Sequence, residues 1–143
     1  MIISDKNNVI RELLLVDDDP VILYIHQVIL ANLNPIFLFD FLSGELAINY
    51  LYHPDNKDKQ FLILLDINMP GMDGWAFLEY LKQHSTLSSI HVVIVSSSKE
   101  SSDEIRAAEF PMVIGYLLKP LSEQAMIDLL DKNAQTQGYF LQK

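Results

Sequence analysis

Two apolar runs of strand length in this 143-residue chain end directly on acidic residues. Residues 13–16 (LLLV) are followed by three aspartates at 17–19, and residues 61–65 (FLILL) are followed by Asp66. Two carboxylates about 4 Å apart repel each other by about 4 kcal/mol at an effective dielectric constant of about 20. A fold that places such groups together usually does so to bind a hard cation through oxygen ligands, as Mg²⁺ is bound. The pattern therefore predicts a Mg²⁺ site, with Asp66 as a candidate acceptor of a phosphoryl group.

The composition narrows the classes of protein that remain. Half of the residues are hydrophobic, yet no run approaches the ~18 apolar residues of a membrane span, and the N-terminus has no signal-peptide pattern. The net charge of −9 does not suggest the positively charged surface that binds nucleic acid. Cysteine is absent and the four histidines share no ligand spacing, so we expect them to be surface or structural residues. We expect one cytoplasmic domain without a membrane or nucleic-acid partner.

Segments typical of strands and helices alternate along the chain. Each expected strand is followed by an expected helix, and the first helix starts at Pro20 with Asp19 as its N-cap. Five such units with buried strands predict an α/β fold, a doubly wound parallel sheet with helices on both faces. The expected strands cover residues 13–16, 36–41, 61–65, 90–95 and 113–118.

Polar residues stand at the carboxyl ends of four of these strands. In a doubly wound sheet, ligands bind beyond the carboxyl ends of the strands. We therefore expect five side chains to converge at one edge of the sheet: Asp17, Asp18, Asp66, Ser96 and Lys119.

Four motifs give the chain a specific resemblance. They are LLLVDDDP (13–20), LLDINMPGMDG (64–74), VIVSS (93–97) and GYLLKP (115–120). In these motifs and their order, the chain resembles the receiver domain of two-component response regulators. The resemblance implies a (βα)5 flavodoxin-like fold with strand order 2-1-3-4-5, and a chemotaxis-regulator-like receiver that stands alone.

The resemblance also divides the chain. The receiver domain would cover residues 11–132. Residues 1–10 would form an N-terminal extension, and residues 133–143 a frayed C-terminal tail.

The resemblance implies roles for the acidic residues. Asp66 matches the phosphoacceptor. Asp18 matches the acid that binds Mg²⁺ directly, and Asp17 the acid that acts through metal-bound water. Asn68 would give its backbone carbonyl to the metal.

The same resemblance implies a switch. Ser96 matches the hydroxyl that reaches the phosphoryl group, Lys119 the cation that pairs with it, and Tyr116 the aromatic residue that turns inward on activation. Many relatives have threonine at position 96, and serine keeps the hydroxyl donor. The face formed by the fourth helix, fifth strand and fifth helix would bind a target or a second copy of the chain.

The implied function is signalling by a phosphoprotein rather than turnover of a separate substrate. A histidine kinase or a histidine phosphotransfer protein would phosphorylate Asp66, in a reaction that the receiver itself catalyses and later reverses by hydrolysis. The signal would pass on by protein–protein contact, or the chain would act as a phosphorelay intermediate that passes the group to a histidine carrier.

Three alternatives fit the sequence less well. A haloacid-dehalogenase-like phosphatase needs an acid two residues after its nucleophile, where this chain has Asn68. A flavodoxin-like FMN binder needs a first loop rich in Ser, Thr and Gly, whereas residues 17–20 (DDDP) repel phosphate. A degenerate receiver that is never phosphorylated would not need all five converging residues.

Overall fold

The computed structural model describes residues 9–84, 89–98 and 100–141, and its centre is a five-stranded sheet. The strand order is β2-β1-β3-β4-β5 and all neighbours are parallel, which confirms the predicted fold and order. Most of the predicted N-terminal extension lies outside the described residues. The strands are β1 (Arg11–Val16), β2 (Leu38–Phe41), β3 (Gln60–Leu65), β4 (Ile90–Ser96) and β5 (Val113–Leu118).

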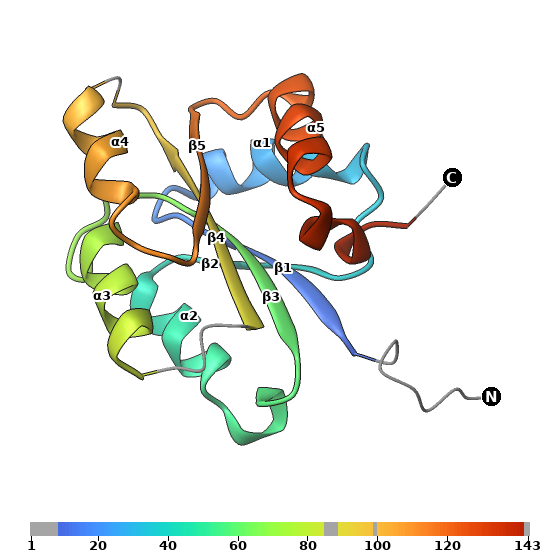
Figure 1. Ribbon diagram of the computed structural model, residues 1–143, viewed down its shortest axis with the longest axis horizontal. Coiled ribbons are helices and arrows are strands. Elements are labelled where there is room, and N and C mark those ends of the chain that lie inside the picture. Colours follow the sequence, from blue (N-terminus) through green and yellow to red (C-terminus); the bar gives the residue numbers. More distant parts are fainter. Residues whose placement is uncertain (1–8, 85–88, 99, 142–143) are drawn as a thin grey trace.

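Helices cover both faces of the sheet. Helices α1 and α5 lie on one face, and α2, α3 and α4 lie on the other (Figure 1). Within the described ranges, no helix is both long and apolar enough to cross a bilayer. The helices are α1 (Pro20–Ala31), α2 (Gly44–Leu51), α3 (Gly74–His84), α4 (Ser101–Ala107) and α5 (Glu123–Lys132), with short 3-10 helices at Pro54–Asn56 (η2) and Ala134–Tyr139 (η4).

Two apolar layers hold the helices to the sheet. Successive side chains of a strand point to opposite faces, so β3 sends Ile63 and Leu65 into the layer beneath α2, α3 and α4. Its residues Leu62 and Leu64 enter the layer beneath α1 and α5. Because the central strands are buried on both faces, they read in the sequence as continuous apolar runs.

Helix α1 buries a different face from the one its sequence suggested. Helical spacing in the sequence places five apolar residues on one face and predicts that this face is buried: Ile22, Ile25, Val28, Ile29 and Leu33. In the structure the side chains of Ile25 and Val28 are 37% and 51% exposed. The buried face consists of Leu23, His26 and Leu30. The expectation failed because α1 is apolar almost all round, so its periodicity has little contrast. Asp19 does cap the helix as predicted, by accepting the N–H groups of the second and third residues that follow.

The segment expected to be a frayed tail is packed against the domain. Tyr139 and Phe140 are buried in the layer beneath α1 and α5. The Ile36 N–H donates to the Tyr139 carbonyl at 3.0 Å, and the Leu141 N–H donates to the Asn34 carbonyl at 2.8 Å. The prediction of fraying is therefore wrong for residues 134–140, because these contacts join parts of the chain that are far apart in sequence.

We predict that this C-terminal packing contributes to stability. Tyr139→Ala should lower the free energy of unfolding by about 3 kcal/mol or more, because it empties a site where the side chain is only 2% exposed. Leu141→Ala is the matched control two residues away, at a side chain that is 60% exposed. Urea unfolding of both variants and the wild type tests the difference. Similar losses in the two variants would contradict the packing seen here.

Candidate functional site

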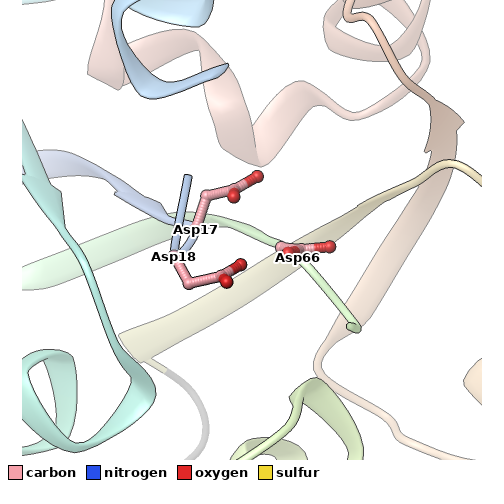
Figure 2. Close-up of side chains that lie close together, drawn as sticks. All are labelled: Asp17, Asp18 and Asp66. Atoms are coloured by element: carbon pink, nitrogen blue, oxygen red, sulfur yellow. The ribbon is translucent and has the colours of Figure 1, made fainter. Parts of the chain in front are cut away.

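The ends of β1 and β3 bring three carboxylates together. Val16 pairs with Leu65 in the sheet, and the Asp66 N–H donates to the Val16 carbonyl at 2.9 Å. The two chains therefore leave the sheet side by side. Asp17, Asp18 and Asp66 each offer a carboxylate oxygen, and these oxygens all lie within 4.8 Å of one another. Figure 2 shows the three side chains pointing to the same side from the two strand ends.

Lys119 bridges two of these acids. Its Nζ lies 2.7 Å from Asp17 Oδ2 and 3.1 Å from Asp66 Oδ1. Its backbone N–H donates to the Ser96 carbonyl at 2.8 Å, so the end of β5 is held against the end of β4. Burial alone would lower the pKa of Lys119, but the two carboxylates more than offset this and the pKa is raised. The side chain is therefore a cation that balances part of the acidic cluster.

Asp66 carries the clearest electrostatic signature of the site. Burial and the nearby charge of Asp17 raise its pKa to about 6, although Lys119 and a hydrogen bond from the Asn68 N–H act in the opposite direction. Buried carboxylates with such shifts cluster at functional sites. The carboxylate of Asp66 is therefore held in a costly charged state at neutral pH, close to the compensating ammonium of Lys119.

The donor set suits a hard divalent cation. Three carboxylates supply oxygen ligands, and the exposed Asp18 opens the cluster to solvent. Asn68, the fourth predicted ligand, is exposed in the turn after β3, and its N–H donates to Asp66 Oδ1 at 3.2 Å. Three of the four residues predicted for Mg²⁺ thus form one cluster at the sheet edge, and the backbone N–H of the fourth is hydrogen-bonded to that cluster.

A glycine fixes the turn that follows Asp66. The Gly74 N–H donates to the Ile67 carbonyl at 2.8 Å. A Cβ at Gly74 would lie 2.6 Å from the Ile67 Cα and 2.8 Å from the Asp66 carbonyl oxygen, so no side chain fits. This contact folds the turn back onto the start of α3 and sets the direction in which the chain leaves Asp66.

The two predicted switch residues meet at the loop after β4. Ser96 is fully buried, and its hydroxyl accepts the Ser98 N–H at 3.1 Å. Tyr116 is half-buried on β5, and its hydroxyl donates to the Ser98 carbonyl at 3.2 Å. The structure therefore joins Ser96 and Tyr116 through the backbone of one residue, a link that the sequence did not suggest.

His26 is a buried residue near this site that the sequence analysis did not connect with it. Its Nε2 accepts the N–H of Leu121, two residues after Lys119, at 3.2 Å. The one available signal was an imidazole on a helix that is apolar at most of its positions. A local pattern of that kind does not reveal a partner 95 positions away.

We predict that removing the charge of Asp66 stabilises the protein at neutral pH. The folded chain keeps a proton on this group up to about pH 6, whereas the ordinary pKa is 3.8. The folded state therefore binds more protons than the unfolded state between these two pH values. The contribution of wild-type Asp66 to the free energy of unfolding is thus complete below about pH 4 and is lost as the pH rises through about 6. In EDTA, Asp66→Asn should exceed the wild type in free energy of unfolding by about 3 kcal/mol at about pH 7.5.

Urea unfolding across this pH range measures the effect. The advantage of Asp66→Asn should shrink steadily toward about pH 4. An advantage that does not change with pH would show that the charge of Asp66 is not its cause.

Comparisons with known proteins place the chain in a family. The profile of the response regulator receiver domain matches residues 13–131. Response regulator Rcp1 of Synechocystis is 31% identical over 110 residues, which cover 74% of this chain and 75% of Rcp1. Probable methanogenesis regulatory protein FilR2 of Methanothrix harundinacea is 35% identical over 82 residues, or 56% of this chain. The chain covers 52% of FilR2 and 28% of chemotaxis protein CheV1 of Helicobacter pylori. It therefore spans about half or less of the length of these two relatives.

Solved structures show the same fold. A two-component response regulator from Cytophaga hutchinsonii superposes with a TM-score of 0.78 at 29% identity, over 90% of this chain and 99% of that one. The bacteriophytochrome response regulator AtBRR superposes with a TM-score of 0.71 at 28% identity, over 94% of this chain and 96% of that one. Together with the profile match over most of the chain, these similarities establish that the protein belongs to the response regulator receiver domain family of two-component signalling.

Proposed function

We propose that Asp66 accepts a phosphoryl group from a histidine kinase or a histidine phosphotransfer protein, and that the modified chain signals through altered protein–protein contacts. The observation that supports this most directly is the setting of Asp66. Its carboxylate is buried, lies beside two further acids and is 3.1 Å from the Lys119 ammonium. Phosphoryl transfer depends mainly on such positioning and charge stabilisation.

The proposed step needs few groups from the chain. A carboxylate oxygen of Asp66 forms a bond to phosphorus while the P–N bond to the histidine of the donor breaks, and its electron pair stays on the imidazole nitrogen. Lys119 pairs with a phosphoryl oxygen, since it already reaches Asp66. The Ser96 hydroxyl donates to another oxygen. Water later hydrolyses the acyl phosphate, which releases inorganic phosphate and restores the carboxylate.

The acidic residues prepare the site for a cation. A Mg²⁺ ion held by Asp17, Asp18, Asp66 and the Asn68 carbonyl would neutralise the repulsion between these carboxylates and the incoming phosphoryl group. Asp17 is already oriented, because its Oδ1 accepts the N–H of Asp19 at 2.9 Å. Asp18 is the exposed member, so it is the acid that solvent and ions reach first.

The outward face of α1 supports a protein as the donor. This helix starts directly after the acidic cluster. Four apolar side chains on its outward face are exposed, and apolar patches of this kind mark contact surfaces. We assign this face to the phosphoryl donor: Val21, Tyr24, Ile25 and Val28.

We predict that Asp66 becomes phosphorylated when Mg²⁺ and a small donor such as phosphoramidate are supplied. Intact-mass analysis should show the addition of one phosphoryl group to the wild type and none to Asp66→Ala. Asp73→Ala is the matched control, because Asp73 lies in the same turn but caps α3 through the Ala76 N–H instead of facing the cluster. Equal phosphorylation of Asp66→Ala and the wild type would refute the assignment.

Phosphorylation would then act on the loop after β4. If the Ser96 hydroxyl turns to the phosphoryl group, it releases the Ser98 N–H that it now accepts. The Tyr116 hydroxyl donates to the carbonyl of the same residue, Ser98. When Ser98 moves, Tyr116 becomes free to rotate inward. This would shift an existing equilibrium and remodel the face formed by α4, β5 and α5, where we place the target or a second copy of the chain.

The single tryptophan of the chain offers a direct test of this switch. Trp75 is buried at the start of α3, and the Arg106 guanidinium of α4 lies 4.4 Å from the centre of its ring. With Mg²⁺, beryllofluoride mimics the phosphoryl group and should change the Trp75 fluorescence of the wild type. Lys119→Ala should still accept phosphate, because the lysine senses the phosphoryl group more than it drives the transfer, but this variant should lose the fluorescence response. A full fluorescence response in Lys119→Ala would rule out this switch. So would the absence of a response in the wild type when fluorine NMR shows that beryllofluoride is bound.

A further inference from the structure

We propose that His26 is a positioning residue for Lys119. Through its hydrogen bond to the backbone of Leu121, it holds the β5–α5 loop where the Lys119 ammonium reaches both Asp17 and Asp66.

The hydrogen bond is fully enclosed. His26 is 3% exposed and Leu121 is 2% exposed, so water does not compete for either group. Leu121 packs in the same apolar layer as Leu23 and Leu30, which flank His26 on α1. A buried N–H without a hydrogen-bond partner is costly, so the contact with the imidazole favours one position of the loop at Leu121.

The imidazole is in the form that this contact requires. A neutral histidine accepts through one ring nitrogen, whereas the protonated ring has no acceptor. Burial lowers the pKa of His26, although the charge of Asp17 acts in the opposite direction. The ring is therefore neutral at physiological pH, with Nε2 as the acceptor for the Leu121 N–H.

Two hydrogen bonds bracket Lys119. On one side its own N–H donates to the Ser96 carbonyl at 2.8 Å, which ties the loop to β4. On the other side Leu121 is tied to His26 on α1. A lysine side chain is a flexible stem, so the position of its backbone determines whether the ammonium reaches two carboxylates at once. Without the His26 contact, only one of the two restraints remains.

The topology makes α1 a suitable anchor. Asp17 lies at the end of β1, and α1 begins three residues later and carries His26. One short segment of chain thus supplies both an acid that Lys119 contacts and the imidazole that holds the loop of Lys119.

The test follows two nuclear magnetic resonance signals of the protein without added metal. His26→Leu removes the acceptor, whereas His26→Gln offers an amide oxygen in its place. In His26→Leu, we expect the Leu121 amide to exchange with solvent about tenfold faster, as the loss of one hydrogen bond predicts. The Lys119 ammonium signal should weaken in the same variant, and His26→Gln should restore both signals.

Lys59 supplies the internal control. Its ammonium pairs with Glu12 at 2.9 Å, far along β1 from the site, so its signal should persist in every folded variant. In any variant that keeps the Lys59 signal, fast exchange of Leu121 with an unchanged Lys119 signal overturns the proposal. If His26→Leu does not fold, His26→Asn applies the same criterion, because its shorter side chain cannot reach the Leu121 N–H.

A second measurement links the contact to the switch and rests on the proposed function. His26→Leu should reduce the Trp75 response to beryllofluoride, and His26→Gln should restore it, because the residue acts through the position of Lys119. A reduced response in His26→Leu that His26→Gln does not restore would show a merely structural role for His26. If the wild type itself fails to respond, the proposed switching fails, while the Leu121 and Lys119 signals still decide the role of His26.

Discussion

The balance between three carboxylates and one ammonium group is the interaction on which the rest of the structure depends. Asp17, Asp18 and Asp66 lie close enough to repel strongly, and Lys119 offsets part of that repulsion through contacts at 2.7 and 3.1 Å. Burial and the charge of Asp17 together raise the pKa of Asp66, so Lys119 does not fully offset them. Because repulsion remains at this site, binding of a cation or redistribution of the negative charge is favourable there. A signal that depends on a phosphoryl group needs this property.

The sheet keeps this unfavourable cluster in place. Parallel strands deliver their carboxyl ends to one edge, and two apolar layers hold those strands between helices. The backbone of Lys119 is hydrogen-bonded to Ser96, and the next residues are held by His26 from the opposite side. The charged side chains at the edge therefore sit on a rigid base, while the loop around Ser98 is linked to both Ser96 and Tyr116 and can respond to them.

Several features of the fold were predictable because they follow from local chemistry. The apolar runs identify buried strands, and Asp19 with Pro20 identifies a helix start. The inner face of α1 was not predictable in the same way, because a helix that is apolar on all sides gives no contrast from which to choose a face. The packing of residues 134–140 was missed because that short segment has no periodicity of its own.

The sequence by itself determined the α/β class, the strand ends that carry the acids, and the motifs that match a receiver domain. These depend on hydrophobic pattern and on residues close together in the chain. Only the tertiary structure decided that Lys119 bridges Asp17 and Asp66, that His26 holds Leu121, and that the C-terminal segment packs beside the residues before β2. These contacts join residues tens of positions apart, so they depend on strand order and on how helices are seated, which no local pattern encodes.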